Sequence, residues 1–131
     1  MNGDVLTPPI VEFLTHHIAS LDELQILMLL VQASTRWFDA KTVSRQLGLS
    51  AEQAQSALDA LAAHNLLDIR ISDDVRYQFR PGRPDLEQVA LETSEVYRRR
   101  PAVVIQVVSG GTSRGVRDFS DAFRLRRRRD G

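Results

Sequence analysis

The chain has 131 residues, of which 43% are hydrophobic, and it carries 17 basic and 17 acidic side chains and no cysteine. This length fits one compact domain with an appended helix or tail, which needs neither a disulfide nor a structural metal to fold. The lack of cysteine excludes zinc ribbons, thiol nucleophiles and redox pairs. No apolar run approaches the ~20 residues that span a bilayer, so we expect a cytoplasmic protein without a membrane partner.

The zero net charge conceals a difference between the two halves of the chain. Residues 1–69 contain three basic and eight acidic side chains, whereas residues 70–131 contain fourteen arginines and nine acids, so the halves carry −5 and +5. A basic half is typical of proteins that bind nucleic acid or anionic lipid. It is also suited to attract the acidic half of the same chain or of a second copy.

Two helices are predicted in the first 34 residues. Thr7, followed by two prolines, favours a helix start, and apolar residues continue at helical spacing to about Ala19. Ser20 and Glu23 then suggest a capping box, in which each side chain accepts a hydrogen bond from the backbone amide of the other residue. The broad apolar stripe behind this box predicts a central helix that ends near Ser34.

Two shorter helices follow a short strand at residues 37–38. Asp39 is placed to cap a helix over 40–47, and Gly48 ends that helix as a residue in the left-handed conformation would. A capping box formed by Ser50 and Gln53 opens the next helix. The buried stripe of that second helix, which reaches about residue 64, is predicted to be Ala54, Ala57, Leu58 and Leu61. The three-residue turn between the two helices indicates a helix-turn-helix.

The hydrophobic period then changes from about 3.6 residues to 2, which predicts two strands. A two-residue loop would pair Ile71 with Arg76 and mix apolar with charged residues on one face. A three-residue loop over 72–74 pairs Ile71 with Val75 and keeps that face apolar, so we predict this register, with Asp74 at positive φ. The expected consequences are burial of Val75, Tyr77 and Phe79, exposure of Arg76, Gln78 and Arg80, and an Arg70–Arg76 pair on the outer face.

The C-terminal part is predicted to be helical after a linker at residues 81–84. One helix begins at Pro84 and ends near Arg99, before Pro101. The valine-rich segment 103–108 has strand propensity as well as a shared helical face, and we favour a helix that Gly110 and Gly111 close. A last short amphipathic helix containing Val116, Phe119 and Phe123 leads into an arginine tail at 126–129.

The order of helix, short strand, two helices and hairpin resembles the winged helix-turn-helix domains of bacterial transcription regulators. The similarity covers residues 20–80 and is carried by the stretches 39–50 and 66–69 together with Ala57, Leu58 and Leu61. The family implies that the helix at 51–64 is the recognition helix and that the hairpin is the wing. We therefore predict a mostly α fold with a small β-hairpin: an N-terminal helix at 1–19, a winged helix-turn-helix at 20–80 and a C-terminal helical extension with an Arg-rich tail at 84–131.

The first functional hypothesis is a DNA-binding transcriptional regulator that acts as a homodimer, because one wing and one helix offer too little contact for operator affinity. The candidate residues for contact with double-stranded DNA are Lys41, Arg45, Gln53, Gln55, Ser56, Arg70, Arg76 and Arg80. The dimer surface is expected on the terminal helices, whose apolar residues exceed what the winged domain needs. Its candidates are Val103, Val104, Val107, Phe119 and Phe123.

The second hypothesis is a winged-helix module that docks a protein partner and does not read DNA. The outward face of the predicted recognition helix carries Glu52 and Asp59 and no base, and a phosphate about 4 Å from either carboxylate repels it by about 1 kcal/mol in water. The facing arginines 70 and 76 favour a bound anion. Asp68, Asp73 and Asp74 are equally placed to form an ordinary salt-bridge cluster with them.

No constellation in the sequence supports catalysis or a metal site. His16 and His17 are adjacent, so they point about 100° apart on a helix, and His64 stands near a helix end. The glycine-rich segment 109–113 lacks the Gly-Lys-Ser/Thr ending of a phosphate loop. We expect no enzyme activity, no cofactor and no metal, and the sequence names neither an operator nor an effector.

Overall fold

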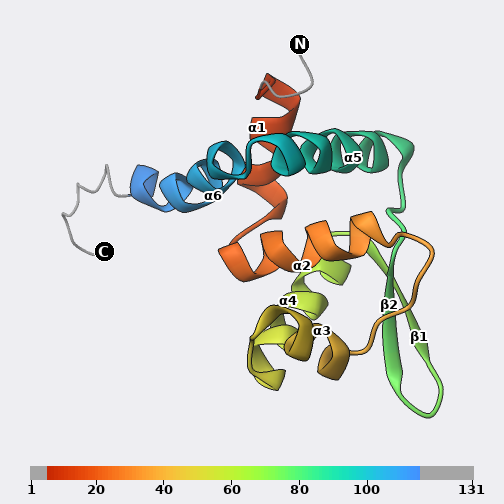
Figure 1. Cartoon of the computed structure of the whole chain (residues 1–131). Coiled ribbons are helices and arrows are strands. Elements are labelled where there is room, and N and C mark those ends of the chain that lie inside the picture. The colour runs from red at the N-terminus through yellow and green to blue at the C-terminus, as the bar shows by residue number, and fades with distance from the viewer. Residues whose placement is uncertain (1–5, 116–131) are drawn as a thin grey trace.

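The computed structural model describes residues 6–115, with side chains to residue 110. Its elements in chain order are α1 (Pro8–His17), α2 (Leu21–Gln32), α3 (Ala40–Leu47), α4 (Ala51–Ala63), β1 (Leu67–Ile71), β2 (Val75–Phe79), α5 (Pro84–Arg99) and α6 (Pro101–Gly115). This is the predicted mostly α fold with a small antiparallel hairpin, and its arrangement is consistent with a winged helix (Figure 1).

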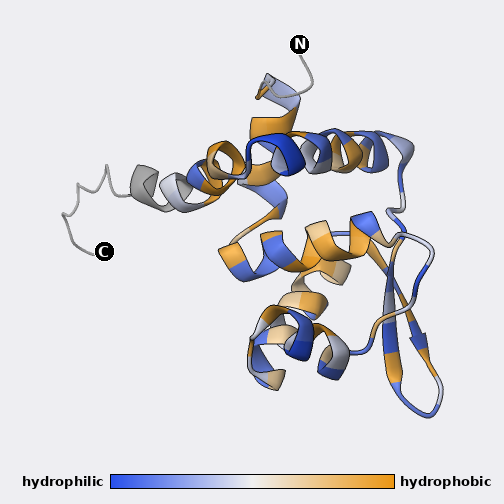
Figure 2. Cartoon of the chain, viewed as in Figure 1, coloured by the Kyte–Doolittle hydropathy of each residue, from blue (hydrophilic) through white to orange (hydrophobic). Residues whose placement is uncertain are grey.

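Helix α2 lies between two groups of elements. Helices α3 and α4 and the hairpin pack on one side of it, whereas α5 and α6 pack on the other, where α1 crosses them (Figure 1). Figure 2 shows hydrophobic residues along most of α2. Leu24, Ile26, Leu27 and Leu30 are fully buried, so both groups share one hydrophobic core.

The N-terminal end of α2 is capped differently from the prediction. The hydroxyl of Ser20 accepts a 3.2 Å hydrogen bond from the amide of Glu23, as expected. The carboxylate of Glu23 instead accepts from the amide of Ala19 at 2.9 Å. The reciprocal half of the predicted box is therefore wrong, because the carboxylate reaches one residue further back along the chain.

Helices α3 and α4 have the predicted caps. Asp39 Oδ1 accepts a 2.8 Å hydrogen bond from the amide of Thr42, and Gly48 ends α3 with a φ of 71°. At the start of α4, Ser50 Oγ accepts from the amide of Gln53 at 3.0 Å and Gln53 Oε1 accepts from that of Ser50 at 2.8 Å. The predicted inner stripe of α4 is confirmed as buried: Ala54, Ala57, Leu58 and Leu61.

The hairpin has the predicted three-residue loop and register. The pairs are Leu67–Phe79, Asp68–Gln78, Ile69–Tyr77, Arg70–Arg76 and Ile71–Val75. An isolated bridge joins Phe38 to Tyr77 across the other edge of β2, with both backbone hydrogen bonds at 2.8 Å. This bridge takes the place of the short strand predicted at residues 37–38.

The outer half of the hairpin is more exposed than predicted. Tyr77 and Phe79 are buried as expected, but Val75 is 38% exposed. The hairpin extends beyond the helices, so only its base reaches the core, and the prediction for Val75 is wrong (Figure 1).

Two further details of the hairpin differ from expectation. Gln78, which was predicted to be exposed, is half-buried. Its side chain lies against the segment that follows α2, where its amide donates to the carbonyl of Thr35 at 2.9 Å. Asp74 does not have a positive φ; of the non-glycine residues in the described part, Asn65 does, with a φ of 68°. The carbonyl of Asn65 accepts from the amide of Gly82 at 3.1 Å, which ties the start of the linker to the end of α4.

The valine-rich segment is helical, as favoured, but α6 continues through Gly110 and Gly111 to Gly115. The predicted helix end at these glycines is therefore wrong. The helix can continue through them because a glycine within a helix costs only about 1 kcal/mol. The predicted helix with Val116, Phe119 and Phe123, and the arginine tail, lie outside the described residues. None of the helices in residues 6–115 combines the length and hydrophobicity needed to cross a bilayer.

Candidate nucleic-acid interface

Basic side chains of α3 and of the hairpin, the predicted wing, lie close to Asp39. Lys41 and Arg45 are exposed on α3, and Arg76 is exposed on β2. The hydrogen bonds from Thr42 lower the pKa of the Asp39 carboxyl, and the positive charges of Arg76 and Arg45 lower it further. Arg45, in the last turn of α3, and Arg76, on β2, are therefore both close enough to Asp39 to act on its charge, although they come from different elements.

Two more arginines rest on the aromatic residues that join α2 to α3. The guanidinium carbon of Arg70 lies 4.5 Å from the centre of the Trp37 ring, and that of Arg36 lies 4.8 Å from the centre of the Phe38 ring. Stacking of this kind orients a guanidinium while its N–H groups stay free to donate. The ion pairs found within the described residues include neither arginine.

The other two wing arginines form ion pairs. Arg76 Nε lies 3.1 Å from both carboxylate oxygens of Asp74, and Arg80 lies 3.5 Å from Asp68 at the base of the hairpin. These side chains are largely exposed, and exposed pairs contribute only about 0–1 kcal/mol. A phosphate can therefore replace the carboxylate at Arg76 at little cost.

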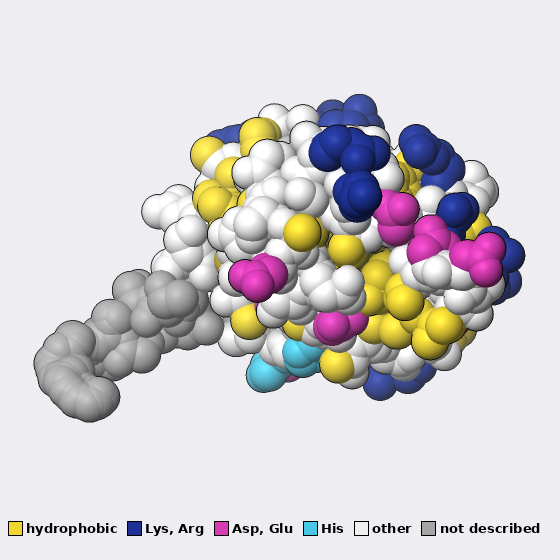
Figure 3. Space-filling model, turned by 90° about the horizontal axis from the view of Figure 1, so that it is seen from below, with side chains coloured by type: hydrophobic (Ala, Val, Ile, Leu, Met, Phe, Trp, Pro, Cys, Tyr) yellow, Lys and Arg dark blue, Asp and Glu magenta, His cyan; other side chains and the backbone are white. Residues whose placement is uncertain are grey.

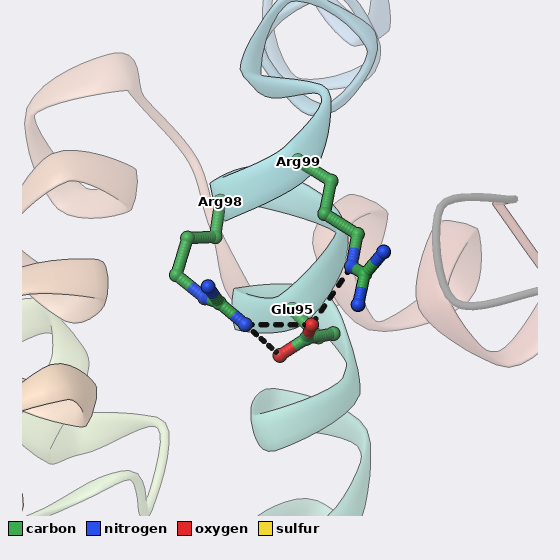
Figure 4. A network of polar contacts seen from close by, with 3 residues as sticks. All are labelled: Glu95, Arg98 and Arg99. Atoms are coloured by element: carbon green, nitrogen blue, oxygen red, sulfur yellow. Dashed lines mark hydrogen bonds and ion pairs between the residues drawn. The ribbon is translucent and has the colours of Figure 1, made fainter.

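We call the exposed set Arg36, Lys41, Arg45, Arg70 and Arg76 the α3–wing basic surface. Basic side chains gather on the face seen from below, where acidic side chains interrupt them (Figure 3). The clustered arginines of α5 behave differently, because Glu95 lies 2.7 Å from Arg98 and 2.9 Å from Arg99 (Figure 4). The hydrogen bond from Arg98, followed by that from Arg99, lowers the pKa of the Glu95 carboxyl.

The outer face of α4 is linked to the wing by a polar contact that the sequence did not predict. The Tyr77 hydroxyl donates to Asp59 Oδ1 at 2.7 Å, and Gln55 Nε2 donates to the Tyr77 hydroxyl at 2.6 Å and to Asp59 Oδ1 at 3.1 Å. Burial raises the pKa of Tyr77 to about 12, and the hydrogen bond to Asp59 contributes to the rise. The available signal was that a buried tyrosine needs a polar partner for its hydroxyl.

These hydrogen bonds occupy the groups with which α4 would read bases. A glutamine that recognises adenine uses both its amide oxygen and its amide nitrogen. The oxygen of Gln53 is bonded to the Ser50 amide, and the nitrogen of Gln55 is bonded to Tyr77. Ser56 is exposed, but so is the acidic Glu52. The arrangement therefore favours phosphate contacts from α3 and the wing over base contacts from α4.

The residues predicted for a dimer interface on the terminal helices fall into three groups. Val104 is fully buried in the core of its own chain. Val103 and Val107 are half-buried on α6, which packs on α1, α2 and α5. Phe119 and Phe123 lie outside the described residues. The apolar side of α6 is thus largely used within the chain.

A cleft of about 320 Å³ lies between α1 and α5 beside His17. The His17 ring stacks on Phe13 with 5.4 Å between ring centres and meets the edge of His64 at 5.5 Å. Burial lowers the pKa of His17, and the proximity of His64 lowers it further. In the described part of the chain, no three His, Cys, Asp or Glu residues are grouped so that they could hold a metal ion.

No family model, no curated protein and no solved structure matches this chain significantly.

Proposed function

We propose that the protein is a winged helix-turn-helix transcriptional regulator that holds double-stranded DNA mainly by its phosphates. The observation that carries the proposal is the α3–wing basic surface, whose five cationic side chains are all exposed. Four of them, all except Arg76, form no ion pair within the described residues. In helix-turn-helix proteins the first helix crosses the DNA backbone, and here that helix is α3 with Lys41 and Arg45.

Such binding depends strongly on salt and weakly on sequence. Each neutralised phosphate changes the slope of log K against log salt concentration by about −0.9, so the five contacts of one chain contribute a slope of about −4 to −5. The occupied amides of Gln53 and Gln55 support the weak dependence on sequence. We further propose that the DNA-binding form is a homodimer, since two copies double the number of phosphate contacts.

The test is a fluorescence-anisotropy titration of two unrelated duplexes at several salt concentrations. The Arg70→Ala/Arg76→Ala variant should weaken binding to both duplexes and flatten the slope by about 2 for each bound copy. The matched control is Arg98→Ala/Arg99→Ala, which removes the same charge from α5, where Glu95 already pairs with both arginines. If the control weakens binding as much as the wing variant, or if no binding occurs at low salt, the proposal is wrong.

One observation favours a second function, the docking of a basic protein segment. A groove of about 290 Å³ lies between the start of α2 and the outer face of α4, and its lining includes Asp22, Glu23 and Glu52. A cationic side chain fits this groove better than a phosphate does. If the wild-type protein, in which the α3–wing basic surface is intact, binds neither duplex at low salt, the result favours protein docking over DNA binding.

A further inference from the structure

Strand β1 has one free edge. Strand β2 is hydrogen-bonded on both sides, to β1 and to Phe38, whereas within residues 6–115 no other strand pairs with the outer side of β1. Figure 1 shows β1 on the side of the hairpin that faces away from the helices. Unpaired backbone groups along such an edge can pair with another chain.

The register of the hairpin shows which backbone groups face this edge. The N–H and C=O groups of Tyr77 bond to Phe38, so the Ile69–Tyr77 pair is one of the pairs without hydrogen bonds between the two strands. The backbone groups of Ile69 therefore point outward, as do those of Leu67 and Ile71 two residues away. Within the described residues, the amide of Ile69 donates only to the adjacent carboxylate of Asp68, at 3.0 Å.

The same part of the wing exposes apolar side chains. Ile69, Ile71 and Val75 are 41%, 75% and 38% exposed, and they lie on one face of the hairpin beyond its buried base. Exposed hydrophobic side chains border charged ones on the face seen from below (Figure 3). An exposed edge next to an exposed apolar face is suited to contact another protein surface.

The charges on β1 indicate that the partner surface is β1 of a second copy of the chain. We propose that two copies of the chain associate by antiparallel pairing of β1 with β1, centred on Ile69. In this register Ile69 lies opposite Ile69 of the second copy, and Leu67 lies opposite its Ile71. Asp68 lies opposite Arg70 of the second copy, twice by symmetry, at the positions where facing side chains approach most closely.

Like charges exclude the neighbouring registers. A shift that keeps the same backbone groups in contact moves the pairing by two residues, which sets Asp68 opposite Asp68 or Arg70 opposite Arg70. The proposed β1–β1 register also offsets a repulsion within each chain. Arg70 faces Arg76 across the hairpin, and in the dimer Asp68 of the second copy lies opposite Arg70. The present contacts of Asp68, with Arg80 at 3.5 Å and with its neighbouring amide, are exposed and exchangeable.

This association does not depend on the DNA-binding proposal. Arg70 is shared by the two proposals, whereas Lys41 and Arg45 lie on α3 and Arg76 lies on β2. Asp68 is not part of the α3–wing basic surface, so Asp68→Arg tests the pairing of β1 without removing a proposed phosphate contact, and the failure of one proposal is distinguishable from the failure of the other.

The test exchanges the two charges of β1. Asp68→Arg gives two arginines on the strand and Arg70→Asp gives two aspartates, so each variant repels itself and its dissociation constant should rise roughly tenfold or more. An equimolar mixture of the two variants should form a heterodimer, and the double exchange Asp68→Arg/Arg70→Asp should restore the homodimer. The matched control is Asp73→Arg, which makes the same charge change in the exposed loop.

Mass is measured by light scattering coupled to size exclusion, over concentrations from low micromolar upward. The wild type and the control should approach twice the 14.8 kDa of one chain. Circular dichroism checks that each variant is folded. Hydrogen exchange of the wild type gives an independent measurement, in which the amides of Leu67, Ile69 and Ile71 become more protected as concentration rises. A wild-type mass of one chain at every concentration, or two single variants that dimerise alone as the wild type does, would overturn the proposal.

Discussion

The contact between Tyr77 and α4 can be tested by removing one oxygen atom. Tyr77→Phe keeps the buried ring and removes the hydroxyl that donates to Asp59 and accepts from Gln55. A hydrogen bond to a charged group contributes about 1.5–3 kcal/mol and a neutral one about 0.5–1.5 kcal/mol. Because Asp59 is exposed and Gln55 is half-buried, water replaces part of the loss. We expect the free energy of unfolding to fall by about 1–2 kcal/mol near neutral pH.

The same substitution changes the response to alkali. The pKa of Tyr77 is raised from the ordinary tyrosine value of 10.0 to about 12 in the folded protein, so between these pH values only the unfolded chain loses this proton. The stabilisation that the wild type gains from its hydroxyl is therefore complete below pH 10 and is lost as the pH rises to about 12. Two pKa units correspond to about 2.7 kcal/mol, which is an upper limit for this loss.

Urea unfolding followed by circular dichroism, on wild type and variant in parallel, measures both effects. Other alkaline groups titrate in both proteins, so the difference between the two curves isolates Tyr77. The wild type should be more stable at neutral pH and should lose that advantage between pH 10 and about 12. A difference that stays constant across this window would refute the reasoning, because the hydroxyl would then have no altered pKa.

The features that the sequence predicted well depend on residues close together in the chain. The caps at Asp39 and Ser50 involve residues three positions apart, and the left-handed Gly48 follows directly from the helix that it ends. The hairpin register also follows from a local argument, since a loop one residue shorter would place a charge on the apolar face.

The features that it predicted poorly depend on distant elements. The exposure of Val75 depends on how far the helices extend beneath the hairpin, and the hydrophobic periodicity of the sequence does not indicate that length. The contact of Tyr77 with Asp59 joins a strand to a helix 18 residues earlier. For the candidate site, the list of basic residues came from the sequence. The structure was needed to see which of these residues stack on aromatic rings, as Arg70 does, and which form ion pairs with acidic residues.

Three further predictions concern the turn, the histidine pair and the acidic face of α4. Gly48→Ala should lower the free energy of unfolding by about 1 kcal/mol, measured by urea unfolding, because a φ of 71° strains any residue with a Cβ, although nothing lies within 4 Å of that atom. Burial lowers the pKa of His17 below its ordinary 6.5, so the unfolded chain takes up this proton first, and stability present above pH 6.5 is lost as the pH falls. His17→Gln should show a weaker acid dependence in the same assay. Glu52→Gln should strengthen DNA binding by up to about 1 kcal/mol at low salt, because it removes an exposed charge from α4, and the gain should shrink as salt rises. Asp59→Asn removes a similar charge but also weakens the acceptor of the Tyr77 hydroxyl, so it should cost stability where Glu52→Gln does not. If both neutralised variants leave DNA binding undetectable and Arg70→Ala/Arg76→Ala changes nothing, the acidic face of α4 is better explained as a docking site for a basic protein.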